Sequence, residues 1–362
     1  MPRVIGIDPG TITIDLCGLD DGLVFIDRSL PTAEALADPA ALVAALETAQ
    51  PLDLIAGPSG YGLPLTAARD LTDTDIRLAY LAAAGEDGGG IGGLRSLMHA
   101  LARSNLPIVV TPGVIHLSSV PSHRKVNRVD MGTADKVCAA ALAIRQQAMR
   151  HGCAEHEVSF VFLELGGAFT AGLAVQGGRI VDGMGGTSGP LGLRAAGALD
   201  GEVAFLAGAV SKRMLFEGGA ASIAGALDAP QTIASPGTNA ERVAWDAYVE
   251  SAAKAVAALS VSIGGGPIEV LLSGRFARIE AVREELTRRL GGLATSVWEV
   301  TGFAVQAKQG AQGAALLADG LAGGTSAALV ERLGIREARG TVLDHLYVIS
   351  ADAARARLGL SS

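Results

Sequence analysis

One folding pattern occurs twice in this chain of 362 residues. Each time, three short apolar runs are separated by tight-turn signals such as Asp-Asp-Gly and Gly-Gly, and helical and apolar segments then alternate. Turns of this kind join antiparallel strands, and strands that alternate with helices indicate a mixed sheet with helical cover. The apolar runs are residues 4–8, 12–19 and 23–30 in the first copy, and 159–165, 169–175 and 179–181 in the second. We therefore expect an α/β protein with two mixed sheets.

The length of the chain suits two domains of about 150 to 200 residues each. We expect long helices over 33–49, 133–150, 240–263 and 306–321, and a loop-rich stretch over 57–93. The predicted divisions are an N-terminal domain over 1–132, a connecting helix over 133–155, a C-terminal domain over 156–322 and a C-terminal cap over 323–362.

Composition and sequence pattern disfavour several classes of partner. The chain has 29 Lys and Arg against 37 Asp and Glu, a formal net charge of -8, which disfavours nucleic-acid binding. Its three cysteines form no CxxC pair, as is typical of a protein from a reducing compartment. The N-terminus has no signal-peptide pattern, and no apolar run reaches the ~20 residues of a membrane span. We expect a cytoplasmic protein that binds neither nucleic acid nor membrane, and we leave a homodimer open.

The first turn carries a candidate phosphate site. Asp8-Pro9-Gly10-Thr11 ends one apolar run, and a second acid, Asp15, follows. Such a turn can place backbone N–H groups and the Thr11 hydroxyl against phosphate oxygens while Asp8 holds a hydrated magnesium ion. Glycine allows this approach because it has no Cβ. The alternative is an ordinary Pro-Gly hairpin with a solvent-facing Asp8.

The second copy repeats the arrangement of a strand-end acid, glycines and a hydroxyl with Glu164, Gly166, Gly167 and Thr170. Two such turns, facing one another across a cleft, would hold a triphosphate from both sides. The pair therefore favours nucleotide binding. Further on, Ser273-Gly274-Arg275 joins an apolar run to a helix, which suits either a nucleoside lying on the backbone or an ordinary strand-to-helix turn.

The order of these segments resembles the actin-like ATPase superfamily, which includes sugar kinases and acetate kinase. G-I-D-P-G-T, N-R-V-D-M-G-T-A-D-K, L-E-L-G-G-A-F-T, L-L-S-G-R-F and A-K-Q-G-A-Q-G-A-A match its phosphate 1, connect 1, phosphate 2, adenosine and connect 2 segments in order. The opening G-I-D-P-G-T-x-x-x-D-x-C-G-L-D-D-G looks like a prokaryotic family labelled predicted butyrate kinase. The resemblance covers nearly the whole chain and implies two ribonuclease H-like domains around an interdomain nucleotide cleft, with ATP and Mg2+ as cofactors.

The resemblance also assigns residues by position. Glu164 stands where many members of the superfamily have Asp, so its carboxylate lies one methylene further out. The implied set is Asp8 and Glu164 as metal-binding acids, Gly10, Thr11, Gly166, Gly167 and Thr170 as phosphate contacts, and Gly274, Arg275 and Gly310 as further nucleotide contacts.

Two acids in the connecting segment, Asp130 and Asp135, are candidates for a catalytic base or a charge-orienting residue. They can equally be helix caps, with Asp135 in a surface ion pair with Lys136. Asp8 is also a catalytic candidate, as the acid that organises the metal. Arg128 is the fourth, because phosphoryl transfer develops negative charge that an arginine stabilises.

Acceptor contacts are expected from two loops. His116 and Arg124 lie before the connecting helix, where they are either functional or solvated. Thr187 and Ser188 lie in a G-T-S-G-P loop that resembles the acceptor-facing loop of butyrate and acetate kinases, or that merely connects two elements.

The function predicted is thus an ATP-dependent kinase that phosphorylates a short-chain carboxylate or a hydroxyl compound. Two alternatives stay open: a nucleotide-binding sensor or activator ATPase, and an ATP-dependent ligase that acts through an acyl phosphate. The opening motif also resembles Holliday-junction resolvases, but the acidic balance, the length and the second turn oppose that function.

Overall fold

A computed structural model describes residues 2–82, 90–225 and 230–360. The chain forms two compact units. Unit 1 contains Met1–Val129, Thr133–His156 and Gly302–Ser362, and unit 2 contains Asp130–Gly132 and Glu157–Thr301. Among the helices of the described ranges, none combines the length and the apolar character that crossing a bilayer requires.

Unit 1 is built on a six-stranded sheet with the order β3-β2-β1-β4-β6-β5. β1, β2 and β3 form the predicted antiparallel meander, β4 and β6 run parallel to β1, and β5 is antiparallel to β6. Asp21 and Gly22 have positive φ angles of 52° and 77° at the β2–β3 turn, as the Asp-Asp-Gly signal predicts. The strands are β1 (Arg3–Pro9), β2 (Thr13–Asp20), β3 (Leu23–Pro31), β4 (Leu54–Pro58), β5 (Thr66–Ala67) and β6 (Ile108–Thr111).

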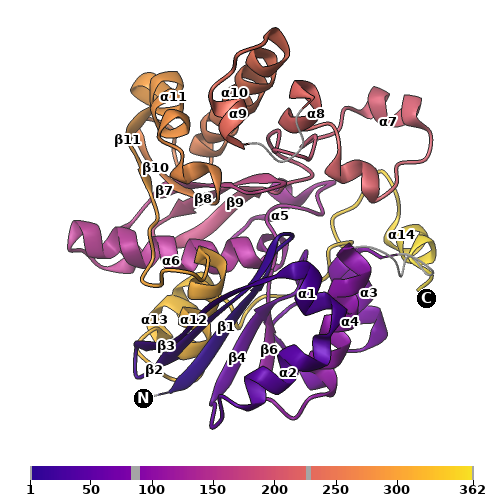
Figure 1. Cartoon of the computed structure of the whole chain (residues 1–362), viewed down its shortest axis with the longest axis vertical. Coiled ribbons are helices and arrows are strands. Elements are labelled where there is room, and N and C mark those ends of the chain that lie inside the picture. The colour runs from indigo at the N-terminus through magenta and orange to yellow at the C-terminus, as the bar shows by residue number, and fades with distance from the viewer. Residues whose placement is uncertain (1, 83–89, 226–229, 361–362) are drawn as a thin grey trace. The chain divides into compact units, whose positions relative to one another are not determined.

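Helices cover both faces of this sheet (Figure 1). On one face, apolar side chains of α1 to α4 pack on Ile5, Ile7 and Ile14. On the other, α12 contacts β1, β2 and β4 and packs against α6. The helices of unit 1 are α1 (Thr32–Ala37), α2 (Pro39–Glu47), α3 (Asp73–Tyr80), α4 (Gly90–Arg103), α5 (Ser122–Lys125), α6 (Ala134–His151), α12 (Gln309–Leu321), α13 (Ala327–Leu333) and α14 (Ala351–Arg357).

Glycines bring α12 very close to β1 and α6. A Cβ added to Gly6 on β1 would lie 2.2 Å from the carbonyl oxygen of Ala311. A Cβ added to Gly313 on α12 would lie 1.7 Å from the carbonyl oxygen of Cys138 on α6. Both distances are too short for any side chain, so glycine at these two positions is what allows α12 to pack this closely on β1 and α6.

Unit 2 repeats the same plan. Its five-stranded sheet has the order β11-β10-β7-β8-β9, in which β7, β8 and β9 form an antiparallel meander and β10 and β11 run parallel to β7. The strands are β7 (Phe160–Leu165), β8 (Thr170–Gln176), β9 (Arg179–Met184), β10 (Ile268–Ser273) and β11 (Ala294–Glu299). The two meanders predicted from sequence are thus confirmed.

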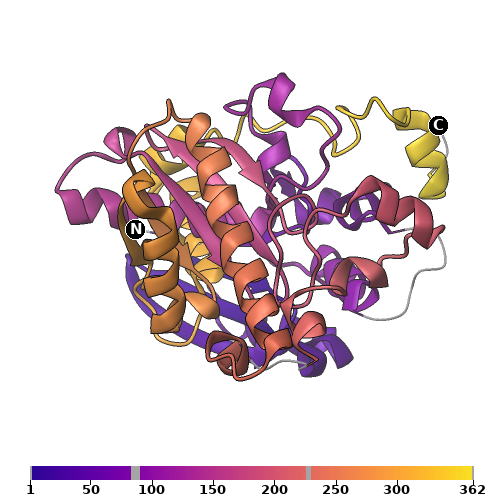
Figure 2. The same cartoon turned by 90° about the horizontal axis from the view of Figure 1, so that it is seen from above.

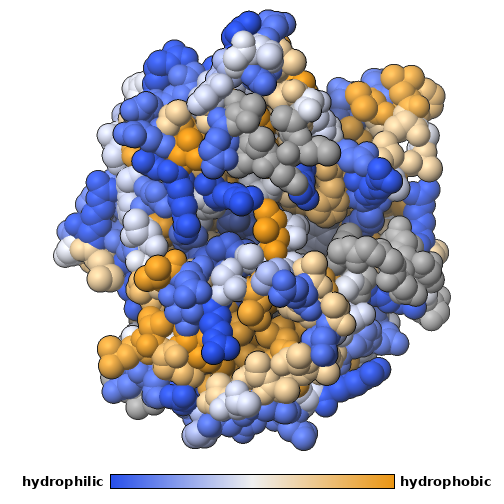
Figure 3. Space-filling view, in the orientation of Figure 1, coloured by the Kyte–Doolittle hydropathy of each residue, from blue (hydrophilic) through white to orange (hydrophobic). Residues whose placement is uncertain are grey.

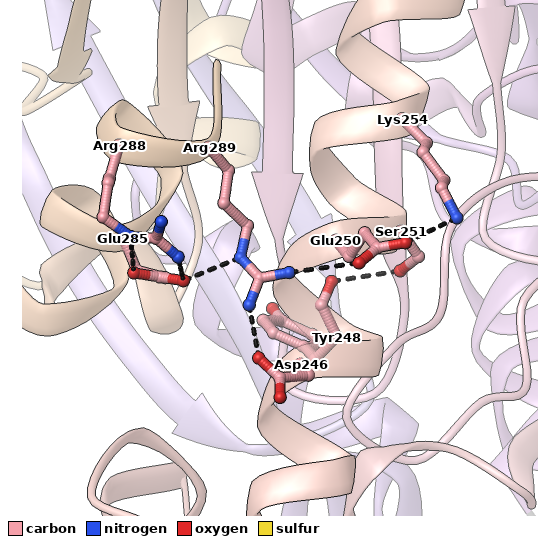
Figure 4. Close-up of polar contacts among 8 residues, drawn as sticks. All are labelled: Asp246, Tyr248, Glu250, Ser251, Lys254, Glu285, Arg288 and Arg289. Carbon is pink, nitrogen blue, oxygen red and sulfur yellow. Dashed lines mark hydrogen bonds and ion pairs between the residues drawn. The ribbon is translucent and has the colours of Figure 1, made fainter. Parts of the chain in front are cut away.

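One face of the unit 2 sheet is covered by α8, α9, α10 and α11, and Figure 2 shows α10 and α11 lying over the strands. Arg289 on α11 also joins the two long helices, because it donates to Glu285 on its own helix and to Asp246 and Glu250 on α10 (Figure 4). The helices of unit 2 are α7 (Gly201–Ala207), α8 (Ala220–Ala224), α9 (Pro230–Ala234), α10 (Asn239–Val261) and α11 (Glu280–Leu290).

The short helix α7 has an apolar exposed surface. Val203, Phe205 and Leu206 are 50%, 78% and 81% exposed, and their patch is visible in Figure 3. Such a concentration of exposed apolar side chains is unusual on a helix of a globular protein.

The units divide the chain differently from the predicted domains. The helix predicted to connect the domains, α6, belongs to unit 1, and so do residues 302–362, which include α12. The physical reason is the close packing of α12 on β1 and α6. The predicted cap over 323–362 is also part of unit 1.

Two local predictions also change. The helix predicted over 33–49 is interrupted at Asp38, and Pro39 begins α2. The loop-rich stretch predicted over 57–93 contains β5, α3 and the start of α4, while its residues 83–89 lie outside the described ranges.

Candidate functional site

The β1–β2 turn places two acids opposite one another. Asp8 and Asp15 are a cross-strand pair in register, and they are 6% and 0% exposed. The N–H of Gly10 donates to the carbonyl oxygens of Asp8 and Thr13, each at 3.0 Å, which closes the turn. The Gly10 N–H is therefore already hydrogen-bonded within the turn. Thr11 lies at the exposed tip of the turn.

Lys308, the residue that precedes α12, compensates these acids. Its Nζ lies 2.9 Å from Asp15 Oδ2 and 3.8 Å from Asp8 Oδ2, and it donates to the Thr13 carbonyl oxygen at 3.3 Å. Two glycines make room for this arrangement. A Cβ on Gly10 would lie 2.5 Å from Lys308 Nζ, and a Cβ on Gly310 would lie 2.5 Å from Asp8 Oδ2.

A third acid, Asp135, lies in the first turn of α6 in the same unit. It accepts from Lys136 Nζ at 2.5 Å and from the Thr133 hydroxyl. Burial alone would raise the pKa of Asp135, but Lys136, Thr133 and Lys308 outweigh burial and lower it. We call Asp8, Asp15, Asp135, Lys136 and Lys308 the charged cluster of unit 1. Its three carboxylates and two ammonium groups leave one net negative charge.

Residues 303–307, which precede Lys308, are held by hydrogen bonds to two side chains. Asp27 on β3 accepts from the N–H groups of Val305, Gln306 and Ala307 at 2.7 to 3.1 Å. Burial raises the pKa of Asp27, but these three donors outweigh it and lower the pKa below its usual value. Gln312 accepts from the N–H groups of Phe303 and Ala304 and donates to the Ala307 carbonyl.

The charged cluster suits a hydrated magnesium ion. Carboxylate oxygens are the protein ligands that Mg2+ prefers, and one or two suffice because waters and phosphates complete its shell. Asp15 Oδ1 is buried and has no hydrogen-bond partner among the described residues. Among the residues that the structure describes, no group of three or more His, Cys, Asp or Glu side chains is arranged to hold a metal.

In unit 2 the β7–β8 turn closes in the same way as the first. The N–H of Gly166 donates to the Phe169 carbonyl oxygen at 2.9 Å, as that of Gly10 does to Thr13. The strand registers then match Glu164 with Asp8 and Gly167 with Thr11.

The same registers match Thr170 with Ile14 and Ala171 with Asp15. Thr170 is fully buried, and its hydroxyl lies near that of Tyr248 on α10. The structure therefore places Thr170 in the interior of unit 2 rather than at the turn, and the second turn has one acid instead of two.

The turn that follows β10 lies beside the β7–β8 turn. Ser273 is in register with Glu164, and Gly274 has a φ of 92°. A Cβ on Gly274 would lie 2.4 Å from the Leu165 carbonyl oxygen, so glycine is required here by the neighbouring strand. Arg275 is exposed and lies at the start of a 3-10 turn over Phe276–Arg278.

Asp130, Thr187 and Ser188 come together within unit 2. Asp130 Oδ2 accepts from both the N–H and the hydroxyl of Thr187 at 2.9 Å, and Oδ1 accepts from the Gly132 N–H at 3.2 Å. The Ser188 hydroxyl donates to the Asp130 carbonyl oxygen. A Cβ on Gly185 would lie 1.7 Å from Asp130 Oδ1. Asp130 thus holds residues 185–188 against residues 130–132, and we call residues 185–188 the loop of Asp130.

The candidates before the connecting helix lie in unit 1. His116 is 3% exposed, and burial lowers the pKa of its imidazole to about 4. Arg124 and Arg128 are half-buried. The C-terminal segment holds this region, because the Arg339 N–H donates to the His116 carbonyl and Asn127 Oδ1 accepts from the N–H of Tyr347.

Lys308 is the residue of the charged cluster that sequence reasoning missed. A signal was present, because a lysine immediately before a helix lies at the positive end of the helix dipole. A positive charge at that end of a helix is unfavourable unless carboxylates lie nearby. Asp8 and Asp15, which the sequence already offered as candidates, could have been paired with it.

Solved structures with the same fold cover 80 to 87% of the chain. Acetate kinase from Porphyromonas gingivalis has a TM-score of 0.59 at 11% identity and covers 87% of this chain and 98% of its own. A propionate kinase from Francisella tularensis has a TM-score of 0.59 at 14% identity, with 86% and 99% covered. Acetate kinase from Entamoeba histolytica has a TM-score of 0.58 at 12% identity, with 80% and 86% covered.

These likenesses confirm the predicted fold class: two α/β units with mixed sheets, as in the actin-like ATPases. At such low identity they establish the fold alone. No curated protein sequence matches the chain significantly. A model of the family described as protein of unknown function DUF1464 matches residues 6–348, and the chain therefore belongs to that family.

Proposed function

We propose that this protein is a phosphotransferase that uses ATP and Mg2+. The observation that carries the proposal is the charged cluster of unit 1, in which two buried carboxylates face each other at a glycine turn and one oxygen of Asp15 has no partner among the described residues. Phosphoryl transfer consists mainly of positioning and charge stabilisation, and a cluster of this kind suits both.

Within unit 1, Asp8 and Asp15 would hold the hydrated metal, and Thr11 would contact phosphate oxygens from the exposed tip of the turn. When bound, magnesium supplies positive charge that neutralises the phosphate groups. In unit 2, Glu164, Gly166 and Gly167 form the corresponding turn. The buried Thr170 is left out of this proposal.

We propose the remaining nucleotide contacts from their positions next to the acids of the two turns. Gly274 and Arg275 follow β10 beside Glu164, and the exposed guanidinium of Arg275 suits an anionic or ribose partner. Gly310 lies against Asp8, where a Cβ would meet the carboxylate at 2.5 Å.

For the acceptor we propose a short-chain carboxylate. The support is the fold shared with acetate and propionate kinases, together with an Arg128 that is only half-buried and can meet developing negative charge. His116 suits this role less well, because an imidazole with a pKa of about 4 is neutral near pH 7.

Calorimetry tests the nucleotide part of the proposal. A non-hydrolysable ATP analogue with Mg2+ is titrated into the wild type, Asp8→Ala and Thr170→Val. We expect binding to the wild type and to Thr170→Val, and weak or no binding to Asp8→Ala. Absence of binding to the wild type at millimolar analogue would refute the proposal.

The acceptor is tested separately by trapping an acyl phosphate with hydroxylamine. Acetate, propionate and butyrate are each incubated with Mg-ATP and the wild type. Hydroxamate from any of them supports the carboxylate kinase. Nucleotide binding with no hydroxamate from all three would exclude these acceptors and favour the hydroxyl compounds.

A further inference from the structure

Lys308 occupies the place where a divalent cation would be expected to meet Asp8 and Asp15. Its ammonium lies within 2.9 Å of Asp15 Oδ2 and 3.8 Å of Asp8 Oδ2. The other oxygen of Asp15 is buried and has no partner among the described residues, so the acidic pair is not saturated by the lysine. A single ammonium therefore only partly compensates the pair.

The position of Lys308 on its own helix makes it replaceable. It is the N-cap residue of α12, where the helix dipole disfavours a positive charge. Its side chain is 37% exposed, whereas that of Asp15 is 0% exposed. A lysine also carries its charge on a flexible four-carbon stem, so the ammonium can move while the backbone stays in place.

The backbone around Lys308 is, by contrast, firmly held. Asp27 accepts from the three N–H groups that precede it, and Gln312 fixes the residues before those. This anchoring keeps the stem of Lys308 next to the acidic pair, so that motion of the ammonium is a local rotation of the side chain.

We propose that Lys308 is a built-in placeholder cation that a divalent metal displaces from Asp8 and Asp15, and that the released ammonium then pairs with phosphate. This inference rests on the proposed function, because the phosphate that receives the lysine is that of the nucleotide. Its consequence is that the free protein binds divalent metal weakly and that metal and nucleotide bind cooperatively.

Mn2+ binding without nucleotide tests the first half. Free Mn2+ is measured by electron paramagnetic resonance during titration of the wild type, Lys308→Met and Lys308→Met with Asp15→Asn. We expect Lys308→Met to bind Mn2+ more tightly than the wild type by a factor on the order of ten or more. The reason is that the ammonium, which lies 2.9 Å from Asp15 Oδ2 and competes with the metal for the carboxylates, is removed. The added Asp15→Asn substitution should remove that gain.

Lys254→Met is the matched control, because Lys254 pairs with Glu250 on the surface of α10, in unit 2. It should bind Mn2+ as the wild type does. Equal Mn2+ affinity of the wild type and Lys308→Met, or weaker binding by Lys308→Met, would overturn the proposal.

A second measurement keeps the test valid if Lys308→Met does not fold. The chain has five lysines, which allows their 13C-dimethylated amines to be resolved by NMR: Lys125, Lys136, Lys212, Lys254 and Lys308. In the wild type, Mg2+ with the ATP analogue should shift the Lys308 signal, assigned through Lys308→Arg, while the Lys254 signal stays in place. A Lys308 signal that does not respond when the analogue binds would also overturn the proposal.

These outcomes separate the inference from the proposed function. Mn2+ binding that rises in Lys308→Met, with no nucleotide binding by the wild type, supports competition between Lys308 and the metal but refutes both the kinase and the pairing of Lys308 with phosphate. Nucleotide binding that leaves the Lys308 NMR signal unchanged refutes the displacement of Lys308 and leaves the proposed nucleotide site standing.

Discussion

Replacement of Asp130 distinguishes an organising role from a catalytic one. Its two carboxylate oxygens accept from opposite sides, Oδ1 from the Gly132 N–H and Oδ2 from the N–H and hydroxyl of Thr187. Asn has only one side-chain oxygen, so in Asp130→Asn one side must present an N–H to another N–H. The residue is 5% exposed, and water therefore offers little compensation.

The expected loss follows from these contacts. One buried donor left without a partner costs about 1 to 3 kcal/mol, and two bonds that change from charged to neutral acceptors lose roughly 1 kcal/mol together. Asp130→Asn should therefore destabilise unit 2 by roughly 2 to 4 kcal/mol, and Asp130→Ala by at least as much.

Tryptophan fluorescence is a selective assay for this unit. The chain has two tryptophans, Trp245 and Trp298, and both lie in unit 2. Urea unfolding followed at these residues reports the free energy of unfolding of unit 2. Thr187→Val is the control, because it removes one of the three bonds and should cost about 1 kcal/mol.

A double-mutant cycle completes the test. Asp130→Ala and Thr187→Val should be non-additive, because both remove the same hydroxyl–carboxylate bond. If the free energy of unfolding of Asp130→Asn lies within about 0.5 kcal/mol of that of the wild type, the reasoning is refuted. The hydrogen bonds of Asp130 within its loop would then not be what stabilises unit 2.

Three further predictions concern packing, charge and the second turn. Gly6→Ala should destabilise unit 1 by about 1 to 3 kcal/mol or more, because its Cβ would lie 2.2 Å from the Ala311 oxygen, and thermal unfolding by circular dichroism measures this loss. Arg289→Met should cost unit 2 roughly 1 to 3 kcal/mol in urea unfolding, since Arg289 is only 15% exposed and contacts three carboxylates. Hydrogen bonds from Arg288 and Arg289 lower the pKa of Glu285 from 4.5 to about 2, so its stabilisation is present above pH 4.5 and is lost as pH falls toward 2; the stabilities of the wild type and Arg289→Met should converge over that interval. Thr170→Val should leave nucleotide affinity unchanged by calorimetry, and a clear loss would return Thr170 to the site.

Local patterns in the sequence predict most elements of the fold. The Asp-Asp-Gly signal places the β2–β3 turn correctly, and the long helix predicted over 240–263 corresponds to α10. The helix α3 was missed although Thr72 and Asp75 form a capping box at its start, a signal that can be read from sequence. Pro39 likewise indicated where the helix predicted over 33–49 divides.

Contacts between distant segments could not be predicted in this way. Asp130 and Thr187 are 57 residues apart, and each looks like an independent polar residue until the fold joins them. Lys308 reaches Thr13 across 295 residues. The position of Thr170 depends on the register of β7 and β8, which the spacing of glycines does not determine.

Unit 1 is assembled from separate stretches of the chain, and its last stretch is synthesised after all of unit 2. Until residues 309–321 leave the ribosome, the face of β1 that carries Gly6 and Asp8 has no α12 to pack against. Residues 157–301 form nearly all of unit 2 and can complete their core earlier. Translation from the N-terminus therefore finishes the second unit first, and a nascent chain that ends near residue 301 carries an open acidic sheet face.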